Sequence, residues 1–183
     1  MISLNLLDTL NVSLINAEFC RLDDSWHYSN VESPFSRIYL IESGKGEVYH
    51  YDRRYDLEPG YVHFIPAFTP SSYHCSEFLN QYYIHFDCEL QGGVEIFTDD
   101  NCQFQVKAQK QDTELFERLI ELNPGKGLKN YDPKKYDRKT HLMRAKHFID
   151  HVEPSIFLET KGIILQLLSR FIFSLKENPS IEN

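Results

Sequence analysis

Histidine is the residue type with which this chain could do most chemistry, because imidazole binds metals and transfers protons near neutral pH. The sequence has eight histidines in 183 residues. A metal site inside a β-barrel needs closely spaced histidines, a carboxylate and a further histidine that converge on one ion. No His-x-His pair occurs, and His50, His63 and His74 each stand alone in a different segment. We therefore predict no metal site.

The sequence also contains no motif for nucleophilic catalysis or for phosphate binding. The four cysteines include no Cys-x-x-Cys pair, so free thiols are expected rather than a zinc site or a disulfide framework. Cys75 directly follows His74, and neighbouring side chains on a strand point to opposite faces. No Gly-x-Ser-x-Gly turn is present, and the glycines at 44–46 and 125–127 do not have the setting of a phosphate loop. We predict no catalytic residues, no cofactor and no enzymatic activity.

Aromatic and polar side chains at alternate positions remain, and their chemistry is that of small-molecule binding. In the segment 80–87, alternation places Gln81, Tyr83 and His85 on one face of a strand. Rings for stacking, combined with hydrogen-bonding groups, suit a sugar or another hydroxylated ligand, and a nearby arginine would favour an anionic group. The full candidate ligand-binding set is Tyr73, Gln81, Tyr83, Trp26, Arg37, Tyr39 and His85. The alternative is that these are ordinary solvent-facing strand residues and half-buried tyrosines.

Short strand-like runs separated by turn residues must position these side chains. Turns are predicted at Ser43–Gly46 and Glu58–Gly60, where glycine supplies a positive φ and proline presets the turn. An N-terminal arm with one or two outer strands precedes predicted strands at 37–42, 46–51, 61–65, 72–75 and 80–88, followed by weaker ones at 94–97 and 103–107. Evenly spaced short strands of this kind predict a small antiparallel β-barrel.

After residue 111 the apolar residues recur with a helical period. We predict a helix at 112–122 behind an Asp112-Thr113 cap, a solvated basic loop at 125–139, and further helices at 140–152 and 155–176. The last helix is apolar over a face wider than one packing stripe, so it needs a cover on two sides. We predict that it packs on the barrel and forms a dimer interface through Ile164, Leu167, Leu168, Phe171, Ile172 and Leu175; a wholly intramolecular cover is the alternative.

The predicted organisation is a β-barrel over residues 1–111, a helical dimerisation extension over 112–177, and a tail or start of a linker over 178–183. The fold class is α+β, mainly β. With 19 basic and 27 acidic residues, the chain has a net charge of -8, which disfavours direct binding to DNA. No run is long enough to span a bilayer and no targeting segment is evident. These features predict a cytoplasmic protein with no membrane partner.

Several motifs together resemble the N-terminal regulatory domain of AraC-family transcription regulators. They are the strand and glycine pair at 38–46, Leu57-Glu58-Pro59-Gly60 followed by Ile65-Pro66, the Thr69-Pro70 turn, the strand 82–86, and the apolar helix near the C-terminus. The resemblance implies a cupin-like jelly-roll barrel that binds a small effector, often a sugar, and dimerises through its terminal helices. In that family DNA is bound by a C-terminal domain with two helix-turn-helix motifs, for which this chain has no matching segment.

The resemblance also bears on individual residues. It supports Tyr73, Gln81 and Tyr83 as pocket positions, whereas Ser71 stands where family members commonly have a histidine. The rival interpretation is a stand-alone cupin enzyme, such as a sugar isomerase or a metal-dependent oxygenase. A third is a purely structural dimerisation module whose barrel has no cavity.

Overall fold

The computed structural model describes residues 7–90, 97, 101–137 and 152–172. They form one antiparallel sheet of seven strands, with helices after it in the chain. The strands are β1 (Asn11–Asp23), β2 (His27–Val31), β3 (Ser36–His50), β4 (Arg53–Leu57), β5 (Tyr61–Ile65), β6 (Ser71–Glu89) and β7 (Gln105–Lys107), and the helices are α2 (Lys110–Leu122), α3 (Pro133–Tyr136) and α5 (Pro154–Ser169).

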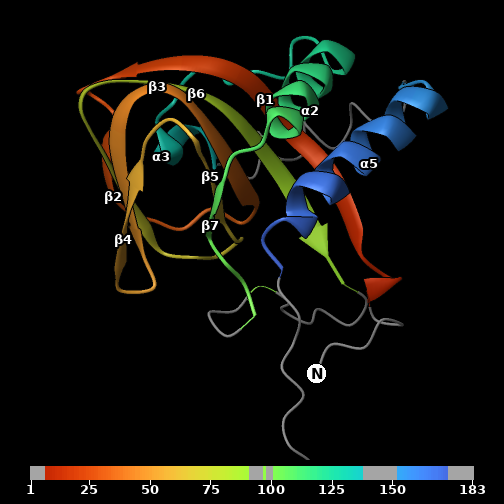
Figure 1. The fold of residues 1–183 in the computed structure, drawn as a ribbon, viewed down its shortest axis with the longest axis horizontal. Coiled ribbons are helices and arrows are strands. Elements are labelled where there is room, and N and C mark those ends of the chain that lie inside the picture. Colours follow the sequence, from red (N-terminus) through yellow and green to blue (C-terminus); the bar gives the residue numbers. More distant parts are fainter. Residues whose placement is uncertain (1–6, 91–96, 98–100, 138–151, 173–183) are drawn as a thin grey trace, which may run out of the picture.

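The sheet has the order β1-β6-β3-β5-β7, with β2 paired to β6 and β4 paired to β3. It curls around α3, while α2 and α5 lie on its other side (Figure 1). Among the described strands the hydrogen-bonded path does not return from β7 to β1. The predicted fold class, mainly antiparallel β followed by helices, is confirmed.

Two predicted strand breaks are wrong. β3 continues through Ser43–Gly46, with register shifts between Ile41 and Ser43 and between Gly44 and Gly46. Gly44 has a φ of 84°, which here serves a bulge that bends the strand instead of a turn that reverses it. β6 likewise runs unbroken from Ser71 to Glu89. A reversing turn and a β-bulge both favour a glycine with positive φ, so the local sequence does not distinguish one from the other.

The reversal between β3 and β4 lies at Tyr51-Asp52, where His50 pairs with Arg53. Both turn residues have positive φ, 50° and 56°, as a two-residue type I′ hairpin requires. Asparagine and glycine usually occupy such turns, and a tyrosine there offers no turn signal. The predicted turn at Glu58–Gly60 is confirmed, with Gly60 at a φ of 91°.

Replacing Gly44 by alanine is expected to cost about 3 kcal/mol of unfolding free energy, because a positive φ and a close contact act together. An added Cβ would lie 2.3 Å from the carbonyl oxygen of Phe78. Gly60→Ala is the matched control: its φ is also positive but nothing lies within 4 Å of the new Cβ, so about 1 kcal/mol is expected. Urea unfolding of both variants measures the difference. Equal losses would contradict the role of the Phe78 contact.

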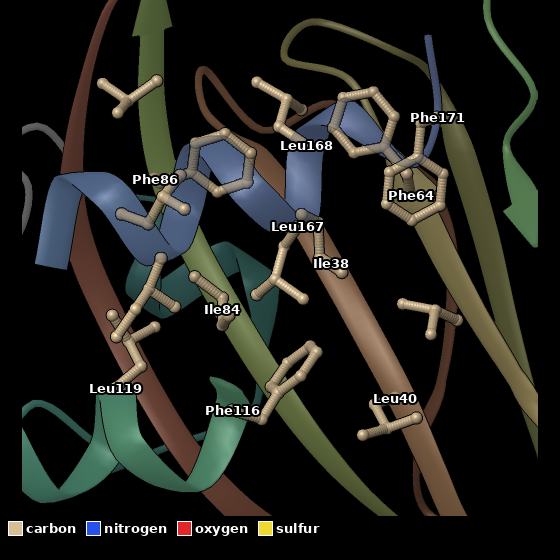
Figure 2. Packing of buried hydrophobic residues seen from close by; sticks show 14 of the residues in the cluster. Ile38, Leu40, Phe64, Ile84, Phe86, Phe116, Leu119, Leu167, Leu168 and Phe171 are labelled. Atoms are coloured by element: carbon tan, nitrogen blue, oxygen red, sulfur yellow. The ribbon is translucent and has the colours of Figure 1, made fainter. Parts of the chain in front are cut away.

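One face of the sheet is covered by α2 and α5, and the side chains between them form the helix-covered core. Figure 2 shows Phe116 and Leu119 of α2, with Leu167, Leu168 and Phe171, directed toward residues of β3, β5 and β6. The rings of Phe64 and Phe171 have centroids 5.2 Å apart.

This packing corrects the predicted dimer interface. Four of these side chains are at most 1% exposed within the single chain, because α5 and the turn after it place them against the chain's own sheet: Ile164, Leu167, Leu168 and Phe171. The intramolecular cover is therefore the role of these side chains. Ile172 is partly buried, and its backbone forms an isolated antiparallel β-bridge with Cys102. Leu175 lies outside the described residues. Dimerisation itself stays a prediction.

The helix boundaries also differ from those predicted. α5 ends at Ser169, earlier than predicted, and a turn follows it. The N-cap of α2 is Gln109, three residues before the expected cap Asp112, and its backbone N–H donates to the Asp112 carboxylate at 2.7 Å. The predicted strand at 94–97 and helix at 140–152 fall mainly outside the described residues, which include only Phe97 and Val152 of these ranges. Within the described part of the chain, no helix has both the length and the apolarity to cross a lipid bilayer.

The other face of the sheet encloses a second group of buried side chains, which we call the inner cluster. Its apolar members are Ile15, Cys20, Leu22, Trp26, Val31, Phe35, Tyr39, Ile41, Val48, Leu57, Ile65, Tyr73, Cys75, Leu79, Tyr83, Leu128 and Tyr136. Two of them, Leu128 and Tyr136, come from the segment predicted to be a solvated loop. That prediction is wrong, because the segment folds into the curl of the sheet and contains α3 (Figure 1).

Candidate functional site

All seven predicted ligand-binding residues are buried inside the curl of the sheet. Strand register explains the coincidence: Arg37 pairs with His85, Tyr39 with Tyr83 and Ile41 with Gln81 across β3 and β6, so alternate positions share the inner face. The exposed fractions are 0% for Arg37, 2% for Tyr73, Gln81, Tyr83 and His85, 3% for Tyr39 and 7% for Trp26. The alternative of solvent-facing strand residues does not hold.

Arg37 is the centre of the polar part of this space. Its guanidinium donates to the hydroxyl of Tyr73 and, at 3.3 Å, to the hydroxyl of Ser71. The two hydroxyl oxygens lie 3.0 Å apart, and Ser71 also donates to the carbonyl of Val31 at 3.2 Å. The Nε of Arg37 has no hydrogen-bond partner among the described residues, and none of the ion pairs among them involves Arg37. A buried cation held only by neutral groups is costly.

Aromatic rings form the walls around this arginine. The ring of Trp26 lies 5.1 Å from that of Tyr73, and His85 lies 4.9 Å from Phe35 and 5.1 Å from Tyr83. Phe35 carried no signal in the sequence beyond its apolarity. Such walls offer stacking surfaces for a ring-shaped ligand.

Two groups in the same space keep hydrogen-bonding capacity. Burial raises the pKa of Tyr39 to about 12, although the charge of Arg37 opposes this rise, so its phenol is neutral and can donate. The Oε1 of Gln81 is buried without a hydrogen-bond partner among the described residues. These groups can orient the polar side of a small molecule.

The segment from Leu128 to Asp137 closes this space, and we call it the plug. The backbone N–H of Leu128 donates to the Tyr83 hydroxyl at 2.6 Å. The ring of Tyr136 lies 5.4 Å from that of His85, and Asp137 accepts from the Ser33 hydroxyl at 2.7 Å.

A sequence signal for the helix in the plug does exist. Asp132 caps α3 by accepting from the Lys134 N–H at 3.0 Å, and Pro133 occupies the first turn. Asp-Pro is a recognised helix start. The surrounding residues have little apolar content, so hydrophobic periodicity predicts no helix there.

Two hollows occur among the described residues, and neither is lined by any of the seven predicted ligand-binding residues. One has a volume of about 310 Å³ between β2 and the plug, lined by His27, Tyr28, Ser29, Asn30, Val31, Glu32, Pro133, Lys134 and Asp137. The other, of about 640 Å³, lies between the β3–β4 hairpin and the turn after β5, lined by Tyr49, His50, Tyr51, Asp52, Arg53, Phe68, Thr69 and Pro70.

A buried histidine pair lies beside the larger hollow and was not predicted. The Nε2 atoms of His50 and His63 are 3.0 Å apart, and the residues are 3% and 0% exposed. Burial, assisted by Arg37 and Arg53, lowers the pKa of His50 to about 3. Burial, with His50 and Arg37 adding to it, also lowers the pKa of His63 well below its usual value. Both imidazoles are therefore neutral at physiological pH.

Metal-ligating groups do not converge in the described part of the chain. No three side chains of histidine, cysteine, aspartate or glutamate there are close enough to share an ion. The four cysteines are free thiols, as expected.

The comparison with solved structures finds proteins of low similarity. A cupin superfamily protein from Desulfitobacterium hafniense has 18% identity and a TM-score of 0.36, over 43% of this chain and 77% of its own. A putative ethanolamine utilization protein Q from Salmonella typhimurium has 15% identity and a TM-score of 0.33, over 42% and 68%. Salicylate 1,2-dioxygenase from Pseudaminobacter salicylatoxidans has 18% identity and a TM-score of 0.35, over 47% and 26%. Values this low carry no argument about ligand or activity.

The comparison with protein families is specific. No curated protein matches the sequence, but the model of the AraC-like ligand binding domain matches residues 18–123. This range includes all seven predicted ligand-binding residues and most of the inner cluster. The sequence motifs, the curled antiparallel sheet and this match agree, and the chain belongs to the family of AraC-like ligand binding domains.

Proposed function

We propose that the chain senses a small-molecule effector for an AraC-type transcription regulator and binds it in the space of the inner cluster. The observation that carries the proposal is the convergence there of a buried arginine, tyrosine hydroxyls, an unpartnered glutamine oxygen and aromatic walls. This combination suits a sugar or a related effector that needs both stacking and directed hydrogen bonds. Effector binding then acts through different affinities for two conformations of the regulator.

The proposal extends to partners and location. DNA would be bound by a helix-turn-helix domain outside this chain, and the protein would work as a homodimer in the bacterial cytoplasm. Since the inner face of α5 is covered by its own sheet, a dimer through α5 would use the outward side, where Leu158 is 67% and Leu165 39% exposed.

A rise in thermal stability with the right effector is the first expected result. A ligand at 100 times its dissociation constant adds about 2.7 kcal/mol, equivalent to a rise of about 5–10 °C in Tm for a chain of this length. Differential scanning fluorimetry against sugars, sugar acids and small organic acids measures it.

Two glutamine-to-alanine variants, one buried and one exposed, test in the same assay where the effector binds. Gln81→Ala should abolish most of the rise, whereas Gln103→Ala, at an exposed position, should keep it. A ligand that stabilises both variants equally would place the site elsewhere, and a panel without any stabilising compound would count against the sensor.

The family assignment favours a non-enzymatic role. Metal analysis of the purified protein separates the sensor from a stand-alone cupin enzyme. Stoichiometric iron, manganese or zinc would favour the enzyme.

A further inference from the structure

The buried charge of Arg37 needs a counter-charge that the described residues supply only incompletely. Its side chain is 0% exposed, its guanidinium bonds only hydroxyls, and its Nε is left without a partner among the described residues. Neutral hydroxyls do not compensate a desolvated guanidinium as a carboxylate does. The charge of Arg37 therefore has no ion-pair partner among the described residues.

The plug brings a carboxyl group toward this charge without completing an ion pair. Burial raises the pKa of Asp137, whereas the Ser33 hydrogen bond and the positive charge of Arg37 lower it. Its Oδ2 accepts from Ser33, but its Oδ1 is buried without a hydrogen-bond partner among the described residues. An acceptor on the plug and a donor on Arg37 thus remain unsatisfied in the same region.

The residue before Asp137 occupies the aromatic part of the space. The ring of Tyr136 is 8% exposed and lies 5.4 Å from His85 and 6.2 Å from Phe35. Consecutive residues of the plug therefore present a ring to the aromatic wall and a carboxyl group toward the buried arginine. A free small molecule with a ring and a carboxylate would offer the same two groups.

We propose that the effector is a ring-bearing carboxylate, and that Tyr136 and Asp137 of the plug occupy its place when it is absent. This inference rests on the proposed sensor function and adds the chemical class of the ligand. Arg37 takes the carboxylate, and His85 and Phe35 take the ring. The plug must leave, because ligand and plug compete for the same groups.

Displacement of the plug gives binding a consequence outside the site. The plug is held by the Leu128 bond to Tyr83, the Ser33 bond to Asp137 and the packing of Tyr136. On its outer side it carries Lys134 and Lys135, both exposed. Effector binding converts this segment from packed to accessible chain, and a neighbouring domain can read that change.

Pairs of ligands, each a carboxylate and its neutral analogue, test whether the effector is a carboxylate. One pair represents aromatic acids and the other sugar acids. Benzoate is compared with benzyl alcohol, and glucuronate with glucose, by titration of the chain while the fluorescence of its single tryptophan, Trp26, is followed. This residue lies in the inner cluster beside Tyr73. At least one carboxylate should bind about tenfold or more tightly than its neutral partner, and Arg37→Met should remove that preference. The pair that shows it tells an aromatic acid from a sugar acid.

Accessibility of the plug provides the second readout. The binding carboxylate should speed trypsin cleavage after Lys134 and Lys135 by several-fold, and its neutral partner should not. Tyr136→Ala should bind the carboxylate about tenfold more tightly than the wild type, because no competing ring remains. Asp137→Asn should also bind it more tightly. Tyr61→Ala on β5 and Asp24→Asn at an exposed position are the matched controls and should leave the affinity unchanged.

The outcomes separate this inference from the sensor proposal. Equal or tighter binding of a neutral partner would overturn the anionic class while leaving the sensor intact. Weaker carboxylate binding by Tyr136→Ala would show that the plug is part of the binding site, which overturns the competition. Failure of both carboxylates to bind the wild type and Tyr136→Ala also overturns the inference, while a neutral ligand found in the wider panel would still support a sensor.

Discussion

Replacement of Leu167 by alanine is expected to lower the free energy of unfolding by about 4 kcal/mol. Leu167 is 1% exposed, in the helix-covered core between α5 and the sheet (Figure 2). Truncation removes apolar burial and leaves a cavity that two packed layers cannot easily close, and buried leucines lose about 2–5 kcal/mol for this reason. Urea unfolding followed by circular dichroism measures the change.

Leu165→Ala is the matched control two residues earlier on the same helix. Leu165 is 39% exposed, so its truncation should cost less than about 1 kcal/mol in the isolated chain. Leu168→Glu, at a position 1% exposed, should unfold the chain instead of separating a dimer, because it buries an unpaired charge. Light scattering distinguishes the two effects. A folded Leu168→Glu monomer obtained from a wild-type dimer would contradict this packing and place Leu168 in a dimer interface.

Stability is expected to fall steeply as the pH drops from about 6.5. His50 has its pKa lowered to about 3, and His63 has its pKa lowered well below the usual value. Between pH about 6.5 and about 3 the two histidines are protonated in the unfolded chain but remain neutral in the folded chain. The unfolding free energy therefore decreases as the pH falls through this interval. Each histidine contributes a slope of up to about 1.4 kcal/mol per pH unit. Near the lower limit of the interval the protons enter the folded state as well, and the slope flattens.

The pH prediction is checked by urea unfolding at pH 7.5, 6.0 and 5.0 for the wild type and the double variant His50→Gln, His63→Gln. The double variant should lose most of the slope, whatever its stability at pH 7.5. His27→Gln, at an exposed position, should keep the wild-type slope. If the double variant retained the full slope of unfolding free energy against pH, the pH dependence would come from the carboxyl groups instead of this histidine pair.

The shared orientation of the predicted ligand-binding residues on β6 could be predicted from sequence because alternation on a strand is a local rule. Gln81, Tyr83 and His85 fall on one side of β6 whatever that strand pairs with. Whether that side of β6 is buried or faces solvent depends on how the sheet curls. The curl is set by the pairing of β6 with distant strands such as β3. For Gln81 and Tyr83 the resemblance to the family supported the enclosed side, whereas for His85 the prediction rested on alternation alone.

Bulges and turns marked the limit of local signals in the sheet. Gly44 correctly indicated a positive φ, but the chain uses it to bend β3 and not to end it. The contact of Gly44 with Phe78, distant in sequence, makes glycine necessary there. The Tyr51-Asp52 turn is held by the β3–β4 pairing and lacks the residues that would identify it.

Local patterns in the sequence were sufficient for the antiparallel class, for α2 and α5, for the alternation of the predicted ligand-binding residues and for the family motifs. The partners of the apolar surfaces depended on the tertiary structure. A helix pattern shows that α5 has an apolar face, and only packing shows that its own sheet covers Leu167 and Leu168. Likewise a polar segment became the plug because Leu128 and Tyr136 meet residues from β6, about 45 positions or more away. Such contacts are set by the fold of the whole chain, so no local window contains them.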